Sequence, residues 1–400
     1  MTQLILADGT AFEGTSFGAP VDADGPSTPA CRTGREFGTG EVVFNTGMAG
    51  YPESMTDPSY HGQILVFTYP LIGNYGVPSE ELNEHGFSKY LESENIHVRA
   101  IVCAQVSETY SHHAAVQSLQ EWMTKHGIPG LTGVDTRMLT KKLREHGVML
   151  GALVQDSGIR TEEIGKEKTR VPSPESRVPD IEDPNTRNLV AEVSCKDVII
   201  YDAPPAPDQL TVIAYDCGMK RNILRSFLKR GVRVVRVPWD FDLDAYDGHY
   251  DGVFISNGPG DPKTCVPTIK AVACAIENNV PTFGICLGNQ LMALAVGGDT
   301  YKLKYGHRGC NQPCVECAPH TSKRGERCII TSQNHGFAVD ETLPKGWSVW
   351  FRNANDGTVE GIRHESGRFF SVQFHPEATP GPEDANGLFD AFLGIMRHKN

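Results

Sequence analysis

The stretch VPTFGICLGNQLMALAVGG, residues 280–298, decides how the second half of this chain folds. Residues 280–285 form a short apolar run of the kind that buried strands have. From Leu287 onward, apolar residues recur at helical spacing, and Gly297 stands where helices commonly end. The stretch therefore predicts a strand, a sharp turn at Cys286 and a helix.

Cys286 stands in that turn, between Gly284 and Gly288, in the pattern G-x-C-x-G. This is the pattern of a nucleophile elbow with a thiol in place of the serine hydroxyl. Small neighbours permit the sharp turn, and the positive end of the following helix favours the thiolate. The N–H of Leu287 is placed to hold a developing oxyanion. The alternative is a buried structural cysteine, because cysteine is often buried.

A base for this thiol is predicted at the end of RFFSVQFHPE, residues 368–377. Pro376 restricts His375 to an extended conformation, in which residues two apart point the same way. Glu377 can therefore orient the imidazole of His375. The carboxyl ends of parallel strands meet at one edge of a sheet, so the elbow and this segment can come together. The pair favours a triad of Cys286, His375 and Glu377.

The rest of residues 210–400 alternates strand-like and helix-like segments, which is typical of an open, mostly parallel α/β sheet. The loop SNGPGD, 256–261, follows one predicted strand, and its glycines let backbone N–H groups approach a ligand closely. A tight turn is the alternative for this loop. Taken alone, SQNHGF, 332–337, is interpreted as a hairpin turn.

The chain before this region divides into two parts. Residues 1–155 mix predicted strands at 41–46, 62–70 and 98–106 with predicted helices at 114–127 and 136–147, so a mixed α/β domain is expected. Residues 156–209 are rich in proline and charge and are expected to form a connector. Within the connector, 188–201 is apolar enough to form a strand docked on a neighbour.

Composition restricts the partners and the compartment. The 400 residues carry 37 Lys and Arg against 49 Asp and Glu, a net charge of −12, which argues against nucleic acid or an anionic membrane as partner. No signal peptide or membrane span is predicted. The 11 scattered cysteines favour a reducing compartment, so a cytoplasmic location is expected.

With SNGPGD, the elbow, QNHGF and HPE in this order along the chain, residues 210–396 resemble a class I glutamine amidotransferase. The resemblance implies that Cys286 attacks the side-chain amide of glutamine to give a thioester and ammonia. It also implies that His375 transfers the proton and that Glu377 orients His375.

The first domain is similar to the amino-terminal domain of the carbamoyl phosphate synthetase small subunit, through GEVVFNTGMAGYPESMTDPSYHGQILVFTYPLIGNYG, 40–76, and GVDTRMLTKKLREHG. That resemblance implies glutaminase activity in carbamoyl phosphate synthesis, for pyrimidine or arginine synthesis, with a separate large subunit or a fused synthetase domain as partner. ATP, Mg²⁺ and bicarbonate would be used by the partner, and no cofactor is expected on this chain. By the same likeness, L-glutamine would be held by Ser59, Gly258, Gly260, Leu287, Gln290, Asn334, Gly336 and Phe337. Contact with Ser59 would place the ligand where the two regions meet.

Two other functions and one metal site are the alternatives to these expectations. A non-catalytic scaffold would not need an intact triad, and a stand-alone hydrolase of γ-glutamyl amides would not need the first domain. Asn289 departs from the family, which often has histidine there, but lies outside the triad. A zinc site at Cys310, Cys314, Cys317 and Cys328 with His307 nearby matches structural zinc spacing poorly, so no metal is expected.

Overall fold

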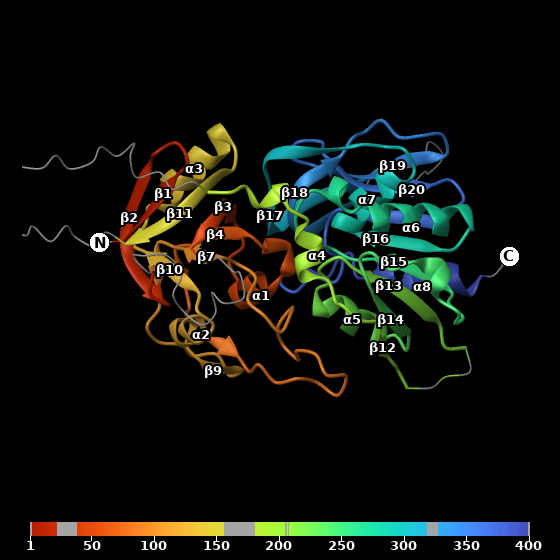
Figure 1. Cartoon of the computed structure of the whole chain (residues 1–400), viewed down its shortest axis with the longest axis horizontal. Helices are drawn as coiled ribbons and strands as arrows, with labels where there is room; N and C mark the ends of the chain where they lie inside the picture. Colours follow the sequence, from red (N-terminus) through yellow and green to blue (C-terminus); the bar gives the residue numbers. More distant parts are fainter. Residues whose placement is uncertain are drawn as a thin grey trace, which may run out of the picture. The chain divides into compact units, whose positions relative to one another are not determined.

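The computed structural model describes residues 2–21, 38–155, 181–204, 206, 208–317 and 327–398. The chain forms two compact units, and each unit consists of three segments that are separated in the sequence. The first unit comprises residues 1–46, 62–80 and 96–184, and the second comprises 47–61, 81–95 and 185–400 (Figure 1). Two short segments of the amino-terminal region thus belong to the second unit. The first part of the predicted connector, residues 156–180, lies outside the described residues.

The first unit is built around a closed barrel with the strand order β1-β11-β3-β4-β7-β10-β2. The pairs from β3 through β4 and β7 to β10 are parallel, and the others are antiparallel. The barrel strands are β1 Thr2–Leu6, β2 Ala11–Gly18, β3 Thr39–Asn45, β4 Gln63–Phe67, β7 Ala100–Val102, β10 Pro129–Thr132 and β11 Met149–Gln155. The strands predicted at 41–46, 62–70 and 98–106 are therefore confirmed in β3, β4 and β7.

The helices of the first unit are α2 Leu119–Lys125 and α3 Thr136–His146. α2 begins later than the predicted residue 114 because Ser118 and Glu121 form a capping box at its start. The residues before this cap instead form β9 Ala115–Gln117, which pairs with β6 Val77–Pro78. A second small sheet joins β5 Leu71–Ile72 to β8 Gln105–Val106.

The second unit contains a ten-stranded sheet in the order β12-β14-β13-β15-β16-β21-β20-β18-β17-β19. Strands β14, β13, β15, β16 and β21 are parallel, and the remaining pairs are antiparallel. The α/β class is confirmed, and the parallel part is the five-strand core. The strands are β12 Ile199–Tyr201, β13 Thr211–Asp216, β14 Arg233–Pro238, β15 Gly252–Ile255, β16 Thr282–Ile285, β17 Thr300–Glu316, β18 Cys328–Val339, β19 Trp347–Asn353, β20 Val359–His364 and β21 Phe369–Val372.

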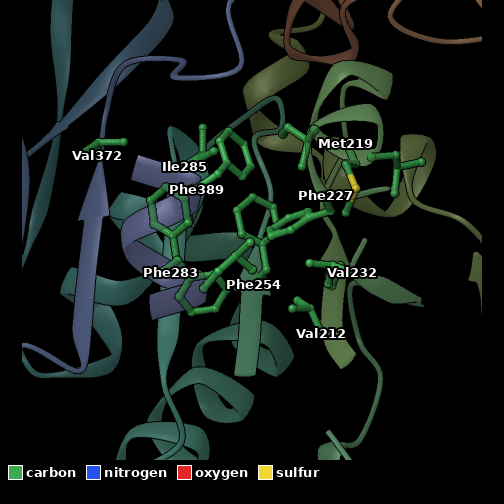
Figure 2. Packing of buried hydrophobic residues seen from close by; sticks show 14 of the residues in the cluster. Val212, Met219, Phe227, Val232, Phe254, Phe283, Ile285, Val372 and Phe389 are labelled. Atoms are coloured by element: carbon green, nitrogen blue, oxygen red, sulfur yellow. The ribbon is translucent and has the colours of Figure 1, made fainter. Parts of the chain in front are cut away.

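Helices cover both faces of the parallel core. Alternate strand residues face opposite ways, so Val212 and Ala214 join one hydrophobic cluster while Ile213 and Tyr215 join the other. On the first face, Phe227 of α5 packs with aromatic residues of the strands and of α8, as Figure 2 shows. α6 and α7 contribute to the cluster on the second face. The helices of this unit are α1 Tyr51–Thr56, α4 Leu189–Val193, α5 Arg221–Leu228, α6 Val266–Glu277, α7 Leu287–Ala295 and α8 Gly387–Arg397.

Two local predictions can be judged here. SQNHGF is not a hairpin turn: it lies within β18, which pairs with β17, so the interpretation from local composition was wrong. Of the apolar stretch 188–201, the first part forms α4 and only Ile199–Tyr201 forms a docked strand, antiparallel to β14. Over the described ranges, no helix has the length and apolarity needed to cross a membrane.

Candidate active site

Cys286 occupies the predicted elbow between β16 and α7. Its backbone has φ 56° and ψ −102°, a conformation that non-glycine residues rarely adopt and that costs on the order of 1–3 kcal/mol. Glycines on either side make the turn possible: a Cβ on Gly284 would lie 2.5 Å from the Gly288 oxygen, and one on Gly288 would lie 2.3 Å from the Ile255 oxygen. The strand, turn and helix predicted from this stretch are confirmed.

His375 and Glu377 follow β21 and form a buried pair. The Nδ1 of His375 lies 2.6 Å from the Oε1 of Glu377, and both side chains are almost fully buried. Burial by itself would lower the pKa of His375, but the charge of Glu377 and the adjacent Cys286 raise it to about 10. Burial would raise the pKa of Glu377, but Lys220 and His375 lower it to about 2. The pair therefore favours an imidazolium beside a carboxylate.

The other ring nitrogen of His375 is available for chemistry with the thiol. Its Nε2 is buried and has no hydrogen-bond partner among the described residues. The Cys286 thiol is near enough to raise the pKa of the ring, and its Sγ lies 3.7 Å from the backbone oxygen of Asn334. Hydrogen bonds between a nucleophile and its base are often loose in a ligand-free site and tighten when substrate binds. The arrangement can serve proton transfer between sulfur and nitrogen.

Lys220 completes this buried cluster, and its contact with Glu377 was not predicted from the sequence. Its Nζ lies 3.1 Å from the Oε1 of Glu377 and donates a 2.6 Å hydrogen bond to the backbone oxygen of Ala378. Lys220 is 2% exposed, and the charges of Glu377 and Glu92 raise its pKa against the effect of burial. Its contact with Glu377 forms only in the folded chain, because the two residues are 157 positions apart in the sequence.

Replacing Lys220 with methionine is expected to destabilise the protein by about 3–5 kcal/mol, because it leaves the Glu377 carboxylate buried without its lysine. Denaturation in urea measures the change in the free energy of unfolding. Lys345→Met, which removes an exposed lysine, is the matched control and should change stability by less than about 0.5 kcal/mol. Equal losses in the two variants would contradict the assigned ion pair.

Stability is also expected to fall as the pH rises from about 6.5 to 10. The pKa of His375 is higher in the folded protein than its ordinary value of 6.5, so its contribution is complete below that value and is lost toward its folded pKa of about 10. The slope is at most about 1.4 kcal/mol per pH unit for this one group. Urea denaturation at several pH values measures it, and His375→Gln should remove this component. An unchanged slope in that variant would contradict the prediction.

The loop after β15 approaches the same edge of the sheet. The Nδ2 of Asn257 donates to the Oγ of Ser59 at 2.9 Å, which ties this loop to the short helical turn Pro58–Tyr60. Gly258 has no room for a side chain, since a Cβ would lie 2.0 Å from the Cys217 oxygen, and Gly260 has φ +84°. The glycines at both positions are therefore required by the backbone path.

Asp57 organises these segments and was missed from the sequence. It accepts hydrogen bonds from the Ser59 backbone at 2.9 Å and from the Asn334 side chain at 3.1 Å. Ser59 belongs to the same compact unit as the elbow. The only available signal was that Asp57 precedes Pro58, which is typical of a residue that caps a short helix.

The remaining predicted glutamine contacts come from α7 and β18. Leu287 begins α7, and Gln290 of the same helix donates a 2.9 Å hydrogen bond from its Nε2 to the backbone oxygen of Phe337. Asn334, Gly336 and Phe337 are in β18, and the Asn334 oxygen contacts the Cys286 thiol. All eight predicted binding residues therefore belong to the unit that holds Cys286, His375 and Glu377. They are Ser59, Gly258, Gly260, Leu287, Gln290, Asn334, Gly336 and Phe337.

Two further sequence interpretations concern neighbouring side chains. Asn289 is fully buried, donates to Gln373 at 3.2 Å and accepts from Ser371 at 2.9 Å, so it supports packing between α7 and β21. Within the described part of the chain, one group of side chains could hold a metal ion, and it consists of His307, His335 and Glu360. None of the four cysteines that we weighed as zinc ligands joins this group.

Comparison with known proteins identifies both regions. The family model for class-I glutamine amidotransferase matches residues 213–395, and the model for the carbamoyl-phosphate synthase small chain, CPSase domain, matches residues 4–153. The chain is 46% identical, over 398 residues, to the carbamoyl phosphate synthase arginine-specific small chain of Aspergillus niger. That alignment covers 99% of this chain and 80% of the relative.

Longer proteins also contain a matching region. The multifunctional protein CAD of Squalus acanthias is 49% identical over 400 residues, and the multifunctional protein URA2 of Saccharomyces cerevisiae is 46% identical over 418. Each alignment covers 99% of this chain, which spans only 16% and 18% of the two relatives. On these matches, and with both family models in order along it, this chain belongs to the carbamoyl phosphate synthase small-chain family.

Proposed function

We propose that this chain hydrolyses L-glutamine to L-glutamate and ammonia, and that the ammonia serves carbamoyl phosphate synthesis by a synthetase partner. The observation that carries the proposal is the position of Cys286 on a strained elbow beside the buried His375–Glu377 pair. Membership of the small-chain family supports the same activity.

In the proposed reaction, the thiolate of Cys286 attacks the side-chain amide carbon of glutamine. The negative charge that develops on the amide oxygen is stabilised by backbone N–H groups, with Leu287 at the start of α7 as the first candidate. The imidazolium of His375 gives its proton to the leaving nitrogen, which departs as ammonia, and a glutamyl thioester forms on Cys286. His375 then takes a proton from water, which attacks the thioester and releases glutamate.

Glu377 and Lys220 act through His375 in this scheme. Glu377 keeps the Nδ1–H of the imidazole pointed toward itself, so Nε2 faces the reaction. Lys220 keeps the pKa of Glu377 low and holds the carboxylate in place. Both are therefore positioning residues for the base.

The eight predicted binding residues are proposed to hold the glutamine. The backbone groups of Gly258 and Gly260, the hydroxyl of Ser59 and the amides of Gln290 and Asn334 offer donors and acceptors for its polar ends. Leu287, Gly336 and Phe337 would complete the site with backbone groups on α7 and β18. The existing hydrogen bonds among these segments support a preformed site.

The partner, the cofactors and the compartment are part of the proposal. We infer a synthetase, either a separate large subunit or a domain of a longer chain, which would use ATP, Mg²⁺ and bicarbonate. The names of the relatives include multifunctional proteins and arginine-specific small chains, so the proposal covers carbamoyl phosphate for either pyrimidine or arginine synthesis. No cofactor is proposed for this chain, and a cytoplasmic location is proposed from its cysteine content.

Glutamate release tests the glutaminase, and carbamoyl phosphate formation tests the transfer of ammonia. Both are measured with glutamine, ATP and bicarbonate, with this chain alone and together with a carbamoyl phosphate synthetase component. We expect glutamate release, increased by the partner, and carbamoyl phosphate only in the mixture. Glutamate release without any carbamoyl phosphate in the mixture would favour a stand-alone hydrolase, and no release in either would favour a scaffold.

A further inference from the structure

The amino-terminal end of α5 directs two side chains toward Glu377. Lys220, the residue before the helix, lies 3.1 Å from the Oε1 of Glu377 through its Nζ. Asn222, in the first turn, donates hydrogen bonds from its Nδ2 to the backbone oxygen of Glu377 and, at 2.8 Å, to the Oγ1 of Thr379. This end of the helix therefore holds Glu377 through both its side chain and its backbone.

The same helix end is capped by Glu92, which comes from a distant part of the sequence. The side chain of Lys220 makes no capping hydrogen bond. Instead, the backbone oxygen of Glu92 accepts from the N–H of Arg221 at 2.9 Å, and its Oε2 accepts from the N–H of Asn222 at 3.1 Å. The first N–H groups of a helix have no partner within the helix, and a negative charge is favourable near them. Glu92 thus supplies a cap that the local sequence of α5 lacks.

The other carboxylate oxygen of Glu92 is held by Arg225, one turn along α5. The Nη1 of Arg225 donates to the Oε1 of Glu92 at 3.1 Å and to the side-chain oxygen of Asn222 at 3.4 Å. Its Nη2 donates to the backbone oxygens of Ser88 and Leu91, at 2.9 and 2.6 Å. Glu92 is fully buried, and a buried carboxylate needs such donors. Asn222 is consequently fixed at its backbone N–H and at its amide oxygen, which leaves its amide nitrogen for the segment after β21.

This hydrogen-bonded path leads to the proposed base and not to the predicted glutamine contacts. It runs from the carboxylate of Glu92 through Asn222 to the backbone of Glu377, whose Oε1 lies 2.6 Å from the Nδ1 of His375. The residues along it differ from the eight that are proposed to hold glutamine. A shift of Asn222 would therefore change the orientation of the base and leave the substrate contacts in place.

We infer that Glu92 is a positioning residue for glutamine hydrolysis: its carboxylate fixes Asn222, and Asn222 fixes the backbone of Glu377 beside His375. This inference rests on the proposed glutaminase function and adds to it a residue from the segment 81–95. The competing explanation is that the pair of Glu92 and its arginine only stabilises the fold. The two explanations differ in what happens to turnover by the folded protein.

Glu92→Gln tests the inference because it keeps the size and the backbone contacts of the residue. It replaces one carboxylate oxygen by an amide donor, which then faces the N–H of Asn222 or the guanidinium of Arg225. With the synthetase component present, we expect kcat per folded protein to fall roughly tenfold, while the KM for glutamine stays within about twofold. An unchanged kcat, or a KM that rises as much as kcat falls, would overturn the inference.

Glu94→Gln is the matched control, because it changes another carboxylate of the same segment. Glu94 accepts hydrogen bonds from Arg221 and from the N–H of Ser88, so it does not contact Asn222 through these groups. We expect kcat and KM to stay within about twofold of wild type. A tenfold loss of kcat in this variant as well would assign the effect to general loosening of the segment and overturn the inference.

A double-mutant cycle shows whether Glu92 acts through Asn222. Asn222→Ala removes the two hydrogen bonds to the segment after β21 and should itself lower kcat roughly tenfold with little change in KM. The double variant should then be about as slow as Asn222→Ala alone. A roughly hundredfold loss, the product of two independent effects, would overturn the inference. If Glu92→Gln does not fold, Asn222→Ala still decides, since an unchanged kcat in that variant would also overturn it.

Nitrogen NMR of the His375 ring in the full chain does not depend on glutaminase activity. The Nδ1 resonance, assigned by its loss in His375→Gln, reports the contact with Glu377. We expect it to shift in Glu92→Gln and in Asn222→Ala, and to stay in place in Glu94→Gln. A resonance that does not move in the first two variants, or moves equally in all three, would overturn the inference. Failure of the proposed function is distinct, because the wild type would then release no glutamate while the His375 resonance still responded.

Discussion

Replacing Cys286 with alanine is expected to lower the rate of glutamine hydrolysis by about ten-thousandfold or more, because no other group in the proposed scheme can form the thioester. In the proposed scheme the buried Nε2 of His375 only transfers protons, and Cys286 is the one nucleophile. Alanine keeps a Cβ in the same φ 56° backbone, so the strain of the elbow is retained and the fold should be unaffected. Loss of activity can then be attributed to the missing sulfur.

Glutamate release, thermal unfolding and covalent labelling together test this prediction. Labelled glutamine should be trapped on the wild type after acid quenching and should not be trapped on Cys286→Ala. Cys274→Ala, which removes a half-buried thiol in α6, is the matched control and should retain both labelling and activity. Activity within a hundredfold of wild type in Cys286→Ala would contradict the assignment of the nucleophile.

The elbow and the contact between His375 and Glu377 could be predicted because each depends on a short local sequence pattern. Nearby backbone atoms leave no space for a side chain at Gly284 or Gly288, so the turn requires glycine at both positions. This requirement can be recognised in the sequence. The extended His375-Pro376-Glu377 segment likewise brings its two titratable residues together, as their 2.6 Å separation shows. Parallel strands then bring both segments to one edge.

Longer-range features could not be predicted in the same way. Local pattern shows that β3 and β4 are strands, but the closure of the barrel through the pairs β1–β11 and β1–β2 depends on contacts between distant segments. The assignment of 47–61 and 81–95 to the second unit also depends on side-chain partners far along the chain. Arg225 of α5, for example, is paired with the fully buried Glu92, and neither position has a distinguishing local pattern.

Buried polar contacts were the least predictable part of the site. Lys220, Asp57 and Glu360 would be expected on the surface from residue type alone, because charged residues are seldom fully buried unless paired. Their partners come from other elements, so the pairing exists only in the folded chain. The groups proposed to react lie in recognisable local patterns, whereas these three buried charged residues do not.

Replacing His375 with glutamine is expected to lower kcat by roughly 10³–10⁴, while the KM for glutamine changes by only a few-fold. The glutamine amide can still donate to Glu377, so the buried Glu377–Lys220 pair keeps a neighbour and the fold is expected to persist. The amide cannot accept and return a proton, so both formation and hydrolysis of the thioester become slow. The proposed glutamine contacts are made by other residues, which is why binding should be largely retained.

The kinetic constants and the trapped thioester distinguish this role from a structural one. Steady-state kinetics with the synthetase component present should show the kcat loss at every pH tested, and His249→Gln, which replaces an exposed histidine, is the control. If His375 only stabilised the fold, the folded fraction of the variant would turn over glutamine at the wild-type rate. If it is the base, the folded fraction stays high and turnover falls, because the Nε2 that faces Cys286 in the wild type has no replacement.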